Sequence, residues 1–147
     1  MEKSTHRKTV ILDSNIWISY HLIDDIFHFE SKRLIHHYFA LNYQIVIPRI
    51  VFYETCNVIS QYANLPNIIS QFLKLIQRNA NCQILDLSNE EYVYFLQNFA
   101  SKLKMKTLDF LIYCCYVKIK PIKFITYDKK FLNIINKFSY EKKNSQK

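Results

Sequence analysis

The chain contains no glycine among its 147 residues. Phosphate-binding loops of the Walker type and dinucleotide-binding loops of the Rossmann type require glycine, because their tight turns bring the backbone close to the phosphate groups. ATP hydrolysis and dinucleotide chemistry by these two routes are therefore excluded. Turns that need a positive φ are expected to use asparagine or aspartate, at some conformational cost.

Cysteine and long apolar runs are also scarce. The four cysteines, Cys56, Cys82, Cys114 and Cys115, show no CxxC spacing, and no N-terminal apolar run resembles a signal peptide. The longest apolar stretches, such as Phe110 to Val117, are far shorter than the roughly 20 residues that span a bilayer. We therefore expect a cytoplasmic protein without a membrane segment.

The charge balance is the first positive indication of function. Twenty Lys and Arg against twelve Asp and Glu give a formal net charge of +8, which attracts polyanions such as nucleic acid or an anionic membrane surface. The alternative is a lysine bias unrelated to binding, because Ile, Asn, Lys, Phe and Tyr are abundant together, as expected of an AT-rich coding sequence.

The length predicts a single domain. Half of the 147 residues are apolar, which is enough to bury a sizeable core. We expect that core between about residues 9 and 135. A basic leader, 1–8, precedes it, and a polar, basic tail, 140–147, is expected to fray.

Short apolar runs alternate with helical patterns along the chain. Strands are predicted at 9–12, 44–47, 83–87 and 123–127. Helices are predicted at 14–20, 29–41, from Pro48 through Ile59, 66–78, from a capping box at Ser88 and Glu91 to about 103, 108–117 with Thr107 as its cap, and 129–136. This order predicts an α/β fold with helices on both faces of a mostly parallel sheet, whose ligands bind beyond the carboxyl ends of the strands.

Four acidic residues stand where an isolated charge is costly. Asp13 follows the first strand and Asp128 follows the last, so both side chains should project from the same edge of the sheet. Glu54 and Asp109 lie in predicted helices between large apolar neighbours. A lone buried carboxylate is unfavourable unless it is paired or metal-bound.

The alternative is that these carboxylates are helix caps or partners of buried lysines, which is common for one carboxylate and less so for four. Too few basic residues interrupt the apolar segments to pair them all. Four converging carboxylates would repel one another unless divalent cations offset their charge. The oxygen ligands favour Mg²⁺ or Mn²⁺.

The segments VILDSNIW, LDFLIYCCY and ITYDKKF, together with the helical glutamate between the first two, resemble the PIN-domain family of nucleases. The resemblance covers roughly Thr9 to Ile135. The order and spacing of these motifs are more specific than any one motif alone. The matching positions are Asp13, Asn15, Glu54, Asp109, Thr126, Asp128 and Phe131. The helix after Asp109 departs from the family, with Tyr113, Cys114 and Cys115 where alanine is favoured, which affects helix packing and no acidic position.

The resemblance implies a three-layer α/β/α fold with a four- or five-stranded sheet. It also implies a Mg²⁺- or Mn²⁺-dependent endoribonuclease, similar to the VapC toxins of type II toxin–antitoxin pairs. Asp13, Asp109 and Asp128 would hold metal, and Glu54 would hold a second ion or orient water. Asn15 and Thr126 would orient these ligands. The expected partners are RNA, an antitoxin and a second copy of the chain.

Basic residues flank the proposed site in the sequence and could clamp RNA phosphates. A solvated lysine face is the alternative for each of them. The candidates are Arg49, Lys104, Lys106, Lys129 and Lys130, with Lys102 leading into the same helix as Lys104 and Lys106.

Three other features admit functional interpretations. Trp17 could stack a base, although an indole one turn after a strand is more often a core residue. His21, Asp24, Asp25 and His28 resemble a zinc-ligand spacing that also recurs by chance on polar helix faces. Asp86 ends a strand like the proposed ligands, but its proximity to Ser88 indicates a helix entry.

Other function classes remain open from sequence alone. The same fold could serve as a non-toxin ribonuclease in RNA processing, or as a binding module for RNA or a protein. An RNase H-like nuclease uses a similar set of acids. That fold opens with a meander of strands, whereas residues 14 to 41 are predicted here to be helical.

Overall fold

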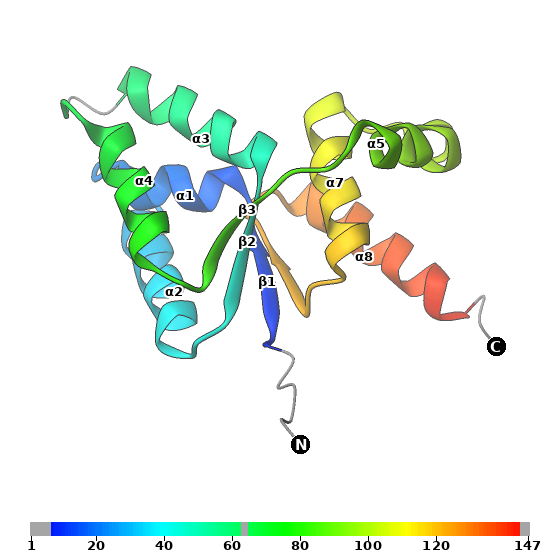
Figure 1. Cartoon of the computed structure of the whole chain (residues 1–147), viewed down its shortest axis with the longest axis horizontal. Helices are drawn as coiled ribbons and strands as arrows, with labels where there is room; N and C mark the ends of the chain where they lie inside the picture. The colour runs from blue at the N-terminus through cyan, green and yellow to red at the C-terminus, as the bar shows by residue number, and fades with distance from the viewer. Residues whose placement is uncertain (1–6, 63–64, 145–147) are drawn as a thin grey trace.

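The computed structural model describes residues 7–62 and 65–144, so the predictions for 1–6 and 145–147 lie outside the described residues. Strands and helices alternate as the sequence predicts (Figure 1). Their bounds are β1 Thr9–Leu12, α1 Ser14–His21, α2 His28–Ala40, β2 Gln44–Pro48, α3 Arg49–Tyr62, α4 Ile68–Arg78, β3 Cys82–Leu85, α5 Asn89–Phe95, the π-helix η1 Leu96–Ala100, α6 Ser101–Leu103, α7 Thr107–Ile119, β4 Lys123–Ile125 and α8 Lys129–Asn144.

The strands form one parallel sheet in the order β3-β2-β1-β4. Ile11 of β1 lies opposite Val46 of β2 and Phe124 of β4. Figure 1 shows α1 to α4 on one side of this sheet and α5, α7 and α8 on the other. The predicted three-layer α/β/α fold is therefore confirmed, with four strands in the described part of the chain.

The strand order places a topological switch point between β1 and β4. After β1 the chain turns to one face of the sheet as α1, and after β4 it turns to the opposite face as α8 (Figure 1). Neighbouring parallel strands that diverge in this way leave an opening at their carboxyl ends, where α/β proteins bind ligands. The Asp13 N–H donates to the Ile125 carbonyl at 2.9 Å, which places Asp13 and the segment after β4 at this opening.

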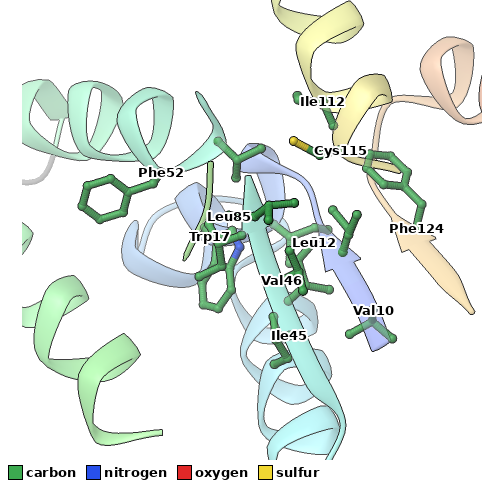
Figure 2. Close-up of a cluster of buried hydrophobic side chains, with 14 of the residues drawn as sticks. Val10, Leu12, Trp17, Ile45, Val46, Phe52, Leu85, Ile112, Cys115 and Phe124 are labelled. Carbon is green, nitrogen blue, oxygen red and sulfur yellow. The ribbon is translucent and has the colours of Figure 1, made fainter. Parts of the chain in front are cut away.

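The central strands are buried on both faces, as expected for parallel strands between two helical layers. Side chains from α1, α3 and α7 close over them in Figure 2, which labels Trp17, Phe52, Ile112 and Cys115. Trp17 is 0% exposed and packs against Phe72 with 5.4 Å between ring centroids. Trp17 is therefore a core residue and cannot stack a base. None of the helices described is both long and apolar enough to cross a membrane.

Several predicted boundaries were wrong by a few residues. Pro48 ends β2 opposite Leu85 instead of opening α3. Thr107 is the first residue of α7 and not its cap, because the N-cap is Lys106, which makes no side-chain capping bond. Helix α8 continues to Asn144 instead of ending near 136, since Phe138 still packs on the core, with its ring 6.4 Å from that of Tyr113.

Among the described residues, four have a left-handed backbone without being glycine. The residues with positive φ are Asn42 (56°), Asn67 (70°), Lys104 (48°) and Lys120 (51°). Asparagine was expected at such positions, and lysine was not. Lys104 and Lys120 follow the last residues of α6 and α7, where a left-handed residue commonly ends a helix.

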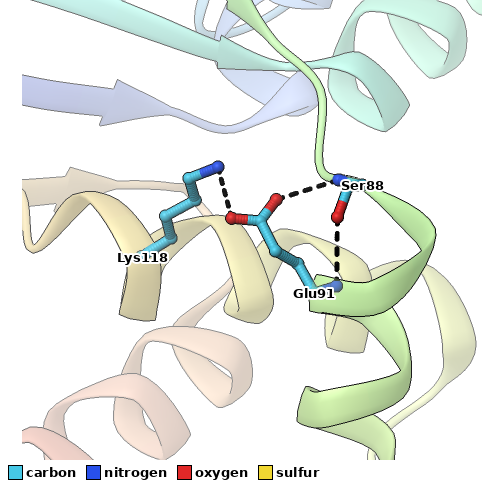
Figure 3. Close-up of polar contacts among 3 residues, drawn as sticks. All are labelled: Ser88, Glu91 and Lys118. Carbon is cyan, nitrogen blue, oxygen red and sulfur yellow. Dashed lines mark hydrogen bonds and ion pairs between the residues drawn. The ribbon is translucent and has the colours of Figure 1, made fainter.

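The predicted capping box is present and joins α5 to α7 (Figure 3). The Ser88 hydroxyl accepts from the Glu91 N–H, and the Glu91 carboxylate accepts from the Ser88 N–H and pairs with Lys118 of α7 at 2.6 Å. We expect Ser88→Ala to lower the free energy of unfolding by about 1 kcal/mol, because an N-cap is lost. Urea denaturation measures this, and Ser88→Asp, which restores a capping oxygen, should recover most of the loss.

Candidate functional site

Asp13 lies at the carboxyl end of β1 and caps α1. Its side chain is buried, with 5% of the residue exposed. Oδ1 accepts a hydrogen bond from the Ser14 N–H at 2.8 Å, and Oδ2 accepts from Asn15 Nδ2 at 3.0 Å and Thr126 Oγ1 at 2.6 Å. These donors fix the carboxylate at the opening between β1 and β4, and Oδ1 keeps acceptor capacity for a ligand.

The Thr126 hydroxyl links the ends of β1 and β4. It donates to Asp13 and accepts from Asn15 Nδ2 at 2.9 Å and from the Asp128 N–H at 2.9 Å. A hydroxyl offers one donor and two acceptor positions, so this one is fully used. Asn15 also accepts from the Tyr127 N–H at 3.2 Å through Oδ1. Four of the residues predicted at the site, Asp13, Asn15, Thr126 and Asp128, therefore form one network.

Asp128 begins the second helix that leaves this opening. Its Oδ1 accepts from the backbone N–H groups of Lys130 and Phe131 at 2.9 and 3.0 Å, which makes it the N-terminal cap of α8. The Asp128 residue is exposed, and Oδ2 has no hydrogen-bond partner among the described residues. Asp13 and Asp128 are thus helix caps, which was the alternative interpretation of these acids. Each still has a carboxylate oxygen that can accept a ligand.

Glu54 of α3 and Asp109 of α7 bring two further carboxylates toward Asp13. Both are half-buried, and neither has a hydrogen-bond or ion-pair partner among the described residues. Burial raises the pKa of Asp13, and the negative charges of Glu54 and Asp109 also raise it. The hydrogen bonds from Thr126 and Ser14 lower this pKa but do not cancel the increase. Burial also raises the pKa of Asp109, and the charge of Asp128 raises it further. The four acids are thus electrostatic neighbours.

The comparison with known families agrees with this arrangement. The family model for the PIN domain matches residues 10–137. The chain belongs to the PIN-domain family. Two solved structures have the fold of this PIN domain, Mycobacterium tuberculosis VapC20 and Rickettsia felis VapBC2. VapC20 is 12% identical with a TM-score of 0.67 over 84% of this chain and 93% of its own. VapBC2 is 21% identical, with a TM-score of 0.57, over 86% of this chain and 92% of its own. No curated protein sequence matches the chain.

PIN-domain nucleases generally use divalent metal ions, and the donor chemistry of this PIN domain suits them. Every candidate ligand is a carboxylate oxygen, the ligand type that Mg²⁺ and Mn²⁺ prefer. In residues 7–62 and 65–144, no group of three or more His, Cys, Asp or Glu side chains is positioned to hold an ion. The carboxylates of Asp13, Glu54, Asp109 and Asp128 therefore act on one another electrostatically without forming such a group in the described part of the chain.

The predicted RNA-binding residues of the PIN domain fall into two groups. Lys102, Lys104 and Lys106 are exposed, whereas Leu103 is buried and Met105 half-buried between them. This alternation turns the lysines to solvent just before Asp109, and the charge of Lys106 acts to lower the pKa of Asp109. The second group, Lys129 and Lys130, is exposed directly after Asp128.

Arg49 differs from the lysines because it is already paired. Its Nε lies 3.2 Å from Asp86 Oδ2, and its guanidinium lies over the Tyr53 ring at 5.9 Å. No sequence pattern indicated this pair, which joins the ends of β2 and β3. Asp86, the strand-end acid set aside as a helix entry, is thus an ion-pair partner of Arg49, and Arg49 is a weaker candidate for RNA than the lysines.

The zinc-like spacing around α1 and α2 has another explanation. His21 Nδ1 lies 2.8 Å from the Trp17 carbonyl, and His28 Nδ1 lies 3.0 Å from the Ser19 carbonyl. Each ring is therefore held by a backbone carbonyl. The two histidines and their acidic neighbours form no metal-holding group within the described part of the chain.

The raised pKa of Asp109 has a consequence for stability. An acid whose pKa is raised on folding stabilises the protein below its ordinary pKa, 3.8, and loses that contribution as pH rises through the folded value. The ionised side chain is thus unfavourable at neutral pH. We expect Asp109→Asn to raise the melting temperature of the metal-free protein at pH 7.

Thermal denaturation in chelator between about pH 4 and pH 8 measures this effect. The advantage of the Asn variant should shrink as pH falls, because wild-type Asp109 then becomes neutral as well. Adding Mn²⁺ should favour the wild type, whose charge the cation offsets. A melting temperature lower than wild type at neutral pH would contradict the raised pKa.

Proposed function

We propose that this PIN domain is a Mg²⁺- or Mn²⁺-dependent endoribonuclease and the toxin of a type II toxin–antitoxin pair. The observation that carries the proposal is the environment of Asp13. A buried carboxylate is held by three donors at a topological switch point, and Glu54 and Asp109 add negative charge to it without a cationic partner among the described residues. Such a site favours a divalent cation.

The structural neighbours support the choice of substrate. VapC20 is described as a toxin that cleaves the sarcin–ricin loop, and VapBC2 was solved bound to a DNA fragment from its promoter. The first is consistent with RNA as the substrate here, and the second with a toxin–antitoxin assembly. The exposed lysines beside Asp109 and Asp128 are suited to hold the phosphates of a nucleic acid.

Each acidic residue has a proposed role. Asp13, Asp109 and Asp128 would hold the cation, and Glu54 would hold a second ion or orient water. When bound, a divalent cation lowers the pKa of coordinated water and offsets negative charge on the phosphate. Thr126 and Asn15 fix the orientation of the Asp13 carboxylate, and Thr126 also fixes the backbone at Asp128.

A cleavage assay on total RNA tests the activity. The purified protein should cleave RNA with Mn²⁺ or Mg²⁺ and should stop when the metal is chelated. Expression in bacteria should arrest growth if the protein is a toxin. Cleavage without growth arrest would favour a processing ribonuclease, and RNA binding without cleavage would favour a binding module.

The proposal includes an antitoxin and a homodimer. Val93, Tyr94 and Leu96, on α5 and the start of η1, are 50%, 57% and 52% exposed. Exposed apolar side chains close together in the chain are typical of protein interfaces, which supports self-association through this helix. Light scattering of the purified chain should give twice the monomer mass, and Tyr94→Lys should give the monomer mass.

A further inference from the structure

Tyr127 lies inside the site, between Thr126 and Asp128, yet its side chain has no role in the acidic network. Its ring stacks on Phe27 of the α1–α2 connection, with centroids 4.2 Å apart and an interplanar angle of 18°. Near-parallel stacking at this distance is the geometry in which a further flat ring can extend the stack. Tyr127, one ring of this pair, is thus the chain neighbour of both Thr126 and Asp128.

Polar contacts hold the Tyr127 ring and the Phe27 backbone in place. The Tyr127 N–H donates to Asn15 Oδ1, and its hydroxyl lies 2.8 Å from the Ser31 hydroxyl, which is completely buried. Phe27 is fixed through its backbone, because its N–H donates to Asp25 Oδ1 at 2.8 Å and its carbonyl accepts from the Ser31 N–H at 2.9 Å. A ligand that stacks here would lose little free energy to ordering the rings.

Phe27 remains accessible although it covers Tyr127. The residue is 37% exposed. Charged residues of both signs lie near the pair. Lys129 and Lys130 are exposed just beyond Asp128, whereas Asp25 and Glu30 are near enough to act on the Tyr127 hydroxyl. Phosphates would be drawn to the lysines, and the carboxylates could accept hydrogen bonds from the N–H groups of a base.

We propose that the Phe27–Tyr127 pair stacks the base of an unpaired nucleotide next to the phosphate that is cleaved. The inference rests on the proposed ribonuclease function and names its substrate more closely, because a base has to leave its helix to stack on a side chain. The substrate class is RNA with an unpaired base beside the cleavage site. Phe27 is then a binding residue and not a catalytic one.

A protein partner is the competing occupant of this surface, because Ile23 and Ile26 are also exposed on the α1–α2 connection. RNA is favoured by three features of the pair: the near-parallel stack, the hydrogen-bonded Tyr127 ring and the backbone bond from Tyr127 to Asn15 of the acidic network. Aliphatic side chains would suffice for a protein partner, whereas stacked flat rings suit a base.

The test combines a protein variant with a substrate variant. RNA oligonucleotides that carry a mapped cleavage site are made with a normal base or an abasic nucleotide beside that site. Phe27→Leu keeps an apolar side chain and removes the ring. We expect it to raise KM about tenfold on normal RNA with little change in kcat, since the base loses the aromatic side chain on which it stacks. On abasic RNA, wild type and variant should be equal.

Phe29→Leu is the matched control, because Phe29 lies two residues further along, in the first turn of α2, is 83% exposed and has its ring against His28 instead of Tyr127. It should behave as wild type. A fluorescent 2-aminopurine at the flanking position should be quenched by wild type with Ca²⁺ in place of the catalytic metal, and less by Phe27→Leu. The abasic substrate tests the wild-type protein directly, so misfolding of a variant cannot decide the result.

The outcomes separate the two proposals. Wild-type protein that cleaves normal and abasic RNA equally well, with Phe27→Leu unchanged, would overturn the stacking inference and leave the ribonuclease intact; that result is the one expected if the surface binds a protein. Wild-type protein that cleaves no RNA with either metal would overturn both. A KM increase for Phe27→Leu that is confined to the normal substrate supports the inference.

Discussion

Asp13→Asn is expected to reduce RNA cleavage by about three orders of magnitude or more while the protein remains folded. The neutral amide of the variant cannot supply the negative charge that holds the cation. Loss of metal assistance removes several kcal/mol of transition-state stabilisation, at about 1.4 kcal/mol per tenfold in rate. Single-turnover cleavage of a labelled RNA in saturating Mn²⁺ gives the rate constant.

The fold should tolerate this change because the carboxylate is unfavourable where it stands. Burial raises the pKa of Asp13, so its ionised form opposes folding at neutral pH. The amide oxygen of the variant can still accept from the Ser14 N–H and cap α1. The circular dichroism spectrum should therefore match wild type. The melting temperature shows how far relief of the buried charge offsets the loss of the Asn15 and Thr126 hydrogen bonds to Oδ2. An inactive variant that had also unfolded would leave the role of Asp13 to be tested by Asp13→Glu, which keeps the charge and moves it.

Asp86→Asn is the matched control for Asp13→Asn. Asp86 also follows a strand at the carboxyl edge of the sheet, but its carboxylate pairs with Arg49. Its substitution removes one negative charge from the same edge without touching the proposed ligands. Activity near the wild-type level is expected. Equal loss of activity in the two variants would show that the edge as a whole, and not the Asp13 carboxylate, determines the rate.

The sheet and the positions of the acidic residues could be predicted because they depend on local patterns. The run Val10 to Leu12 can only be a strand buried on both faces, and a residue that follows such a strand has to appear at the carboxyl edge of the sheet. Glu54 and Asp109 stand in helices that cover opposite faces of that sheet. The capping box at Ser88 was predictable for the same reason, since both its members lie within four residues.

Side-chain partners between distant segments could not be predicted. Arg49 and Asp86 are 37 residues apart, and Tyr127 and Ser31 are 96 residues apart. Each contact depends on how two elements pack across the sheet edge, which no single segment encodes. The end of α8 was misjudged because its polar composition suggested a tail, whereas the apolar spacing of Phe131, Ile135 and Phe138 continues the helical pattern onto the core.

Thr126→Val is expected to lower cleavage by about 10- to 100-fold, the range seen when groups that orient metal ligands are removed. Valine has nearly the same shape, so the change is confined to the hydroxyl. Its loss removes a donor to Asp13 and the acceptor used by Asn15 Nδ2 and the Asp128 N–H. Unpaired polar groups in this partly buried network should lower the free energy of unfolding by about 1–3 kcal/mol. Cleavage rates and urea denaturation measure the two effects.

Thr126→Ser is the control that assigns these effects to the hydroxyl. Serine keeps the oxygen and removes a methyl group, so all three hydrogen bonds can form and activity should stay within about threefold of wild type. A serine variant as impaired as the valine variant would mean that the methyl group, and thus packing, is what matters at this position. Asp13 and Asp128 share the Thr126 hydroxyl as a hydrogen-bond partner. If only the valine variant is impaired, this one hydroxyl, which joins β1 to β4, also sets the orientation of the acids on both sides of the opening.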